Sequence, residues 1–277
     1  MKRSVFPRLV LLLAALGMPV GAGLRVYQLT RCMNEVGLII PGSRILYGML
    51  GFSLIGVVVI AVLCFRLNKV RGGEDCFEGR PVFLFLDLAA ATAMFFGCLQ
   101  RYFDGGSALL FLGGMVAAAC LATASLLYGK RSQTTFWLLL LPCVFFAAQI
   151  ISDFKGWSSD PLVIDFCFRL LTQVCALLAI FHISGFALGY GRKRMTVFWS
   201  VGASVFAAMS APDFFVNRSL PLGQLLLLCG AALWCASHAI RILGEKSQSQ
   251  TAPEGEPFSA PKEEPQPKTE DAPRPEE

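Results

Sequence analysis

Charged residues are scarce in this chain of 277 residues, because Asp, Glu, Lys and Arg make up only 16% of it. In an ordinary soluble domain about a quarter of the residues are charged. Hydrophobic residues account for 55% of the chain and are gathered in long runs. This composition excludes a typical soluble globular protein and indicates a bundle of membrane-crossing helices.

The chain also lacks the motifs that mark common enzyme classes and metal modules. It has no Gly-Lys-Ser/Thr phosphate-binding loop, no His-Glu-x-x-His and no Gly-x-Ser-x-Gly. Its 10 cysteines form no Cys-x-x-Cys pair, and no spacing with its 2 histidines fits a zinc module. We therefore expect no cofactor and no metal, and an enzyme of this sequence would have to act within the bilayer.

Eight uncharged runs, bounded by charged residues, predict eight transmembrane helices. About 20 residues of helix cross a hydrocarbon core of about 30 Å. The predicted spans are about 9–24, 45–65, 81–100, 107–128, 133–152, 165–190, 195–212 and 219–241. The predicted fold class is an all-α integral membrane protein, with four helical hairpins in a membrane domain of residues 1–243.

Lys and Arg residues in the loops predict the orientation of these spans. With the N-terminus in the cytoplasm, the inner side holds 14 of these residues and the outer side holds 7. Positive charge is enriched in cytoplasmic loops, so both chain ends are expected inside. Residues 1–23 also resemble a secretory signal. Cleavage would leave seven spans, whereas we favour retention of the first span.

The last 34 residues, 244–277, have a different composition from the rest. They carry a net charge of −5, against +10 for residues 1–243. This Pro/Glu-rich segment cannot bury enough apolar surface to offset its ordering entropy, so we expect a disordered cytoplasmic tail. The tail either docks a cytoplasmic protein or is solvated without a partner. The net positive charge of residues 1–243 is typical of cytoplasmic loops and does not indicate a nucleic-acid partner.

Asp87 is the clearest functional candidate, because it lies inside the third apolar run, six residues beyond Pro81. Ionisable groups within a membrane are costly and are commonly functional. The two histidines, His182 and His238, fall in the inner halves of their spans. Together the three side chains form a candidate polar site within the membrane, for proton transfer or for a metal ion. Alternatively, neighbouring hydroxyls, backbone or water satisfy each one separately.

A second candidate site lies at the outer ends of the spans, where many polar side chains gather. They are Arg25, Gln28, Arg31, Gln100, Arg101, Asp104, Gln149, Asp153, Asp165, Arg169 and Asp213. Asp165 and Arg169 are four residues apart and share a helix face, which Gln173 continues. The residues favoured for binding a small polar solute are Asp165, Arg169, Gln173, Asp153, Asp213 and Arg101. The alternative is ordinary charge at the level of the lipid headgroups.

A faint internal repeat links two of these acids. Phe146-Ala147-Ala148 precedes Asp153-Phe154 with the same spacing as Phe206-Ala207-Ala208 precedes Asp213-Phe214. The spacing suggests tandem helical hairpins in one orientation. Alternatively, the likeness reflects only the apolar residues and outer acids that such hairpins share.

The segment Leu24-Arg25-Val26-Tyr27-Gln28-Leu29 is followed by Gly37-Leu38 and then by Pro41-Gly42-Ser43. Over residues 24–63 this pattern resembles a group of uncharacterised bacterial multi-pass membrane proteins. The resemblance implies retention of the first helix and, by analogy, a bacterial plasma membrane. The group has no assigned activity to carry over.

Three functional hypotheses follow from the sequence. The favoured one is a small-solute permease or solute-binding protein in the lipid bilayer, based on Asp87, the outer polar group and the repeat. The alternative is a membrane-anchored interaction protein whose tail recruits a cytoplasmic partner. An intramembrane enzyme is the third.

The orientation is directly testable. A reporter fused after Leu243 is expected to report a cytoplasmic location, because the basic loops hold both ends inside. The measurement is the activity of paired reporters that work on opposite sides of the membrane. An extracytoplasmic signal at this position would contradict the orientation.

Overall fold

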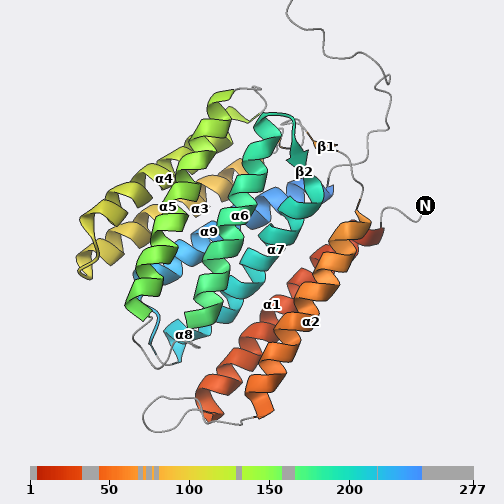
Figure 1. Ribbon diagram of the computed structural model, residues 1–277, viewed down its shortest axis with the longest axis vertical. Coiled ribbons are helices and arrows are strands. Elements are labelled where there is room, and N and C mark those ends of the chain that lie inside the picture. Colours follow the sequence, from red (N-terminus) through yellow and green to blue (C-terminus); the bar gives the residue numbers. More distant parts are fainter. Residues whose placement is uncertain are drawn as a thin grey trace, which may run out of the picture. The chain divides into compact units, whose positions relative to one another are not determined.

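The computed structural model describes residues 5–32, 44–67, 71–72, 77, 81–128, 133–157, 166–216 and 218–244. All of these belong to one compact unit, Met1–Glu245 (Figure 1). Its helices are α1 (Val5–Arg31), α2 (Arg44–Arg66), α3 (Pro81–Phe103), α4 (Ala108–Leu127), α5 (Gln133–Trp157), α6 (Cys167–Ala187), α7 (Lys193–Ser210), α8 (Pro212–Phe215) and α9 (Leu222–Gly244).

Eight helices in the described part, all except the short α8, are long and apolar enough to cross a membrane. The predicted all-α fold with eight spans is thereby confirmed, and the protein is a multi-pass membrane protein. The physical reason is that a backbone N–H or C=O without a partner is costly in hydrocarbon, so a long apolar run satisfies its own backbone as a helix. The predicted disordered tail lies, beyond Gly244, outside the described residues.

The helices extend beyond the predicted spans where charged residues are buried. The first span was expected over residues 9–24, but α1 continues to Arg31 and includes Arg25, whose side chain is 1% exposed. Similarly, α5 continues to Trp157 and includes the buried Asp153. The predicted spans end at the first charged residue. When that residue is paired inside the protein, the helix continues past it and the predicted end comes too early.

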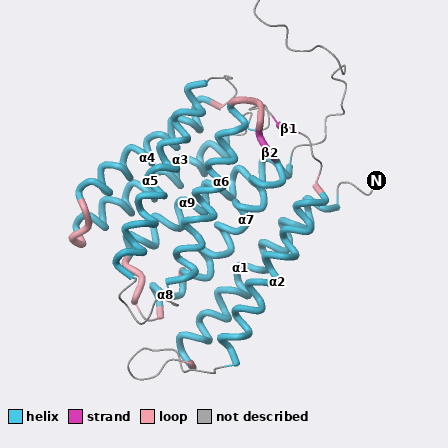
Figure 2. The backbone as a smooth tube through the Cα atoms, viewed as in Figure 1, coloured by secondary structure: helices cyan, strands magenta, loops and turns pink. Residues whose placement is uncertain are grey.

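Six helices form a ring in which each contacts the next, in the order α3, α4, α5, α6, α7 and α9, and α9 returns to α3. Inside this ring α6 also contacts α9. Helix α1 packs on α7, and α2 packs chiefly on α1 and α7, so these two lie side by side outside the ring (Figures 1 and 2). Of the eight long helices α9 is the most buried and α2 the least.

The closest helix packing is between α3 and α9, which run antiparallel. A Cβ atom at Gly97 of α3 would lie 2.7 Å from both the Gly223 carbonyl oxygen and the Leu227 amide nitrogen of α9. A Cβ atom at Gly230 would lie 2.7 Å from the Ala90 carbonyl oxygen. Small residues thus let the two backbones touch, as is common between membrane helices.

Two short strands join the connections at one end of the bundle (Figure 2). Strand β1 (Arg71–Gly72) precedes α3 and pairs antiparallel with β2 (Gly191–Arg192), which lies between α6 and α7. The nearby Phe77 side chain is buried, with its ring 5.0 Å from the rings of both Tyr128 and Phe186. Phe77 therefore packs against the ends of α4 and α6 at this end of the ring.

Replacing Gly97 with Ala is expected to destabilise the bundle, because the added methyl group meets the α9 backbone rather than a flexible side chain. Overpacking of this kind costs about 1–3 kcal/mol. The measurement is reversible unfolding in mixed detergent micelles, followed by circular dichroism.

The matched control is Gly51→Ala on α2, where an added Cβ has no atom within 4 Å. This change should shift stability by less than about 1 kcal/mol, in the direction of the better helix former. Equal effects of the two substitutions would contradict the close α3–α9 packing.

Candidate functional site

Helix α6 carries two buried polar side chains that contact acids from other helices. Arg169 and Gln173 lie one helical turn apart, and both are buried. Arg169 Nη2 donates to Asp213 Oδ2 at 3.1 Å, and Gln173 Nε2 donates to Asp153 Oδ2 at 2.7 Å. Arg169 and Gln173 of α6 therefore connect two neighbouring polar clusters, one around Asp213 and one around Asp153.

The Asp153 cluster consists of Arg101, Gln149, Asp153, Gln173 and Gln224, from α3, α5, α6 and α9. Asp153 accepts three hydrogen bonds. Arg101 Nη2 donates to Oδ1 at 2.9 Å, while the amides of Gln173 and Gln224 donate to Oδ2 at 2.7 and 3.3 Å. Gln149 lies one turn before Asp153 on α5. The cluster thus gathers four helices of the ring around one carboxylate.

Three atoms of this cluster are buried without a hydrogen-bond partner among the described residues. They are Arg101 Nη1, Gln149 Nε2 and Gln173 Oε1. Two of them are donors and one is an acceptor. The Arg101 side chain is 24% exposed, whereas Gln149 and Gln173 are buried. The cluster therefore runs from the surface into the bundle and has unused hydrogen-bonding capacity inside it.

The Asp213 cluster consists of Arg25, Gln28, Arg169, Asp213 and Ser219. Arg25 Nε donates to Asp213 Oδ1 at 2.8 Å, and Arg169 holds the other carboxylate oxygen. Arg169 Nη2 also donates to the Ser219 hydroxyl at 2.6 Å, and Arg169 Nη1 donates to the Ser219 carbonyl oxygen at 3.1 Å. Arg25 also donates to the Gln28 amide oxygen at 2.9 Å. This network fixes α1 to α6 and α8.

The Asp87 cluster lies at the opposite ends of α3 and α9 and consists of Asp87, Tyr128, Ser237, His238 and Arg241. Asp87 is fully buried, and its two carboxylate oxygens accept hydrogen bonds from the Ser237 hydroxyl and from Arg241. His238 Nδ1 lies 2.8 Å from the Trp234 carbonyl oxygen, and Nε2 lies 3.0 Å from the Tyr128 hydroxyl. Because a carbonyl oxygen only accepts, Nδ1 is the ring nitrogen that donates to Trp234.

The structure brings some of the predicted site residues together and separates others. Asp87 and His238 are neighbours, with Oδ1 and Nδ1 3.8 Å apart. His182 is half-buried on α6, where its ring contacts Phe181. No group of three His, Cys, Asp or Glu side chains in the described ranges could hold a metal ion.

Of the outer-face residues, Arg101, Asp153 and Gln173 meet in one cluster, and Arg169 and Asp213 meet in the next. Asp165, which shares a helix face with Arg169 in the sequence pattern, lies outside the described residues. Its predicted partner Arg169 binds Asp213.

No protein-family model, curated protein or solved structure matches this chain.

The contributors that were not singled out from the sequence include Tyr128, Ser219, Gln224 and Arg241. Arg241 had been counted only as a positive charge of the inner side. The available signal was the spacing of Arg241. It stands seven residues after Trp234, with Ser237 and His238 three and four residues after Trp234, and these positions share one helix face. The partner of that face, Asp87 on α3, could not be read from periodicity.

The Asp87–Arg241 pair is expected to behave as one energetic unit. Asp87→Asn leaves the Arg241 guanidinium largely buried without its carboxylate, and loss of one partner of a buried pair costs about 3–5 kcal/mol. Arg241→Gln should have a similar cost. In the double variant the combined loss should be smaller than the sum of the single losses. Chemical unfolding of the four proteins measures this coupling.

The control is Asp104→Asn, which alters an exposed carboxylate bound to the Gln100 amide at 3.2 Å. Its effect should stay within about 0.5 kcal/mol. Strict additivity of the Asp87 and Arg241 losses would argue against the pair.

Proposed function

We propose that this multi-pass membrane protein binds a small polar solute at the Asp153 cluster, as a permease or a solute-binding membrane protein. The observation that carries the proposal is the set of three buried polar atoms without described partners, on two side chains that bind Asp153 and on Gln149, one turn before it. Leaving a buried donor or acceptor unsatisfied costs about 1–3 kcal/mol. A solute that satisfies several of them gains that free energy on binding.

The donor set narrows the chemistry of this solute. Arg101 Nη1 and Gln149 Nε2 are available to donate, and Gln173 Oε1 is available to accept. The solute therefore needs oxygen acceptors on one side and an N–H or O–H group on the other. Asp153 already accepts three hydrogen bonds, so it holds the amides and the guanidinium in position. Small compounds with amide, hydroxyl or carboxylate groups fit this pattern.

The position of the cluster supports access from the aqueous phase. The partly exposed Arg101 lies near the end of α3, and the buried Gln149 and Gln173 lie deeper in the ring. By the orientation predicted from the loops, this end faces outward. Asp87 is 14 residues from Arg101 on α3, about 21 Å along the helix axis. A proton-coupled permease would use the Asp87 cluster near the other face.

The sharpest test is Gln149→Leu, because this substitution removes an unpartnered donor at nearly constant volume. The ligand-free protein should keep its stability or gain slightly, while binding of the solute should weaken about tenfold for the lost hydrogen bond. The measurement is a thermal-shift screen of purified protein against small polar solutes, followed by titration of the compounds that raise the melting temperature.

Gln100→Leu is the matched control, since Gln100 lies at the same end of the bundle and binds the exposed Asp104. It should leave solute binding unchanged. A protein lacking residues 246–277 should also bind normally, whereas a recruiter acting through its tail would lose its partner. The proposal would be contradicted by two results together: Gln149→Leu loses stability, and no solute raises the melting temperature of the wild type. The cluster would then be purely structural.

A further inference from the structure

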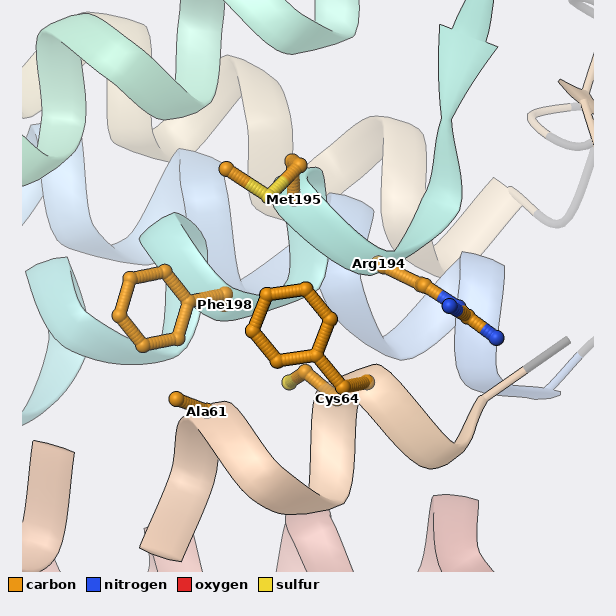
Figure 3. Close-up of a pocket in the computed structure, with 6 residues that line it drawn as sticks. Ala61, Cys64, Arg194, Met195 and Phe198 are labelled. Atoms are coloured by element: carbon orange, nitrogen blue, oxygen red, sulfur yellow. The ribbon is translucent and has the colours of Figure 1, made fainter. Parts of the chain in front are cut away.

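A small hollow lies between α2 and α7, close to the ends of these helices that adjoin β1 and β2 (Figure 3). Its volume is about 60 Å³, and it is lined by Ala61, Cys64, Phe65, Arg194, Met195 and Phe198. In Figure 3, Met195 and Phe198 of α7 face Ala61 and Cys64 of α2. Apart from the arginine, all the lining side chains are apolar.

This hollow belongs to the part of the surface that membrane lipid covers. Helix α2 is the least buried of the eight long helices, and its Val58, Val62 and Phe65 side chains are exposed. The hollow is separate from all three polar clusters, which use none of its lining residues. An apolar hollow left empty loses the dispersion contacts that a hydrocarbon chain would supply.

Positive charge gathers at one end of the hollow. Arg194 Nε donates to the Leu67 carbonyl oxygen at 2.6 Å, which holds the guanidinium at the end of α2 (Figure 3). The exposed Arg66 immediately precedes Leu67 in the chain. The exposed Arg192 immediately precedes α7. Among the described residues, no carboxylate forms an ion pair with Arg66 or Arg194. These arginines lie at the ends of two spans, the depth of lipid headgroups.

We propose that this hollow binds an anionic phospholipid. An acyl chain lies against Ala61, Phe65 and Phe198, and the phosphate binds Arg194 and Arg66. Planar guanidinium groups are well suited to phosphate oxygens, and basic pockets between membrane helices bind anionic headgroups. Since α2 packs chiefly on α1 and α7, the lipid bridges this peripheral helix to the ring.

The experiment uses full-length protein, delipidated in detergent and then supplied with one lipid at a time. The probes are phosphatidylglycerol, phosphatidylcholine with the same chains, and glycerol 3-phosphate, which has the phosphate without the chains. Native mass spectrometry counts retained lipid, and a thermal melt follows stability. Phosphatidylglycerol should be retained and should raise the melting temperature, phosphatidylcholine should do so weakly, and glycerol 3-phosphate should not.

Two variants test the charged end and the apolar part of the site separately. Arg66→Gln should weaken phosphatidylglycerol retention about tenfold, the loss expected for a charge-assisted contact. Ala61→Phe fills the hollow while keeping every arginine, so it should also reduce retention. Arg44→Gln is the control, because Arg44 is an exposed arginine at the opposite end of α2. It should match the wild type.

The outcomes separate this lipid from other occupants. Equal retention of the two phospholipids would overturn selection by charge. Stabilisation by glycerol 3-phosphate alone would mean a free-phosphate site and would overturn the lipid. Wild-type phosphatidylglycerol retention in both Arg66→Gln and Ala61→Phe would overturn the assignment to this hollow. Because each variant is compared with itself with and without lipid, a change in its basal stability does not obscure the result.

Discussion

Three carboxylates are buried in the described part of this helix bundle, and each is held by an arginine from another helix. Asp87 on α3 binds Arg241 on α9, Asp153 on α5 binds Arg101 on α3, and Asp213 on α8 binds both Arg25 and Arg169. A charge taken out of water needs close compensation, since its desolvation is otherwise too costly. These pairs therefore restrict which helices can be neighbours more strongly than the apolar contacts do.

Asp153 and Asp213, which follow the same Phe-Ala-Ala spacing in the sequence, differ in how they are satisfied. The Asp213 carboxylate receives two arginines, and the Ser219 backbone and hydroxyl take up further donors of Arg169. The Asp153 carboxylate receives one arginine and two amides, and atoms of those same side chains are left without partners. The Asp213 cluster thus holds α1 to the ring, whereas the Asp153 cluster retains unused hydrogen-bonding capacity, which the proposed solute would satisfy.

The α3–α9 contact explains how clusters at opposite ends of the bundle are related. Because Gly97, Gly223 and Gly230 let the two backbones touch, the register between the helices is closely defined. The same register sets Arg101 beside Gly223 at one end and Asp87 beside Ser237 and Arg241 at the other. Outside the ring, α2 has fewer protein neighbours, and the lipid proposed for the hollow beside Arg194 would help to hold this helix.

The sequence by itself determined the class of fold and the number of spans, because an apolar run of about 20 residues in a bilayer satisfies its backbone only as a helix. It also determined that Asp87 needed a partner, since a lone charge in hydrocarbon is costly. Helical periodicity further grouped Arg169 with Gln173 on α6. Only the tertiary structure decided that Arg241 is the partner of Asp87, that His182 lies apart from it, and that Arg25 is inside α1. Periodicity tells which residues share the face of one helix, but it carries no information on which faces of different helices meet.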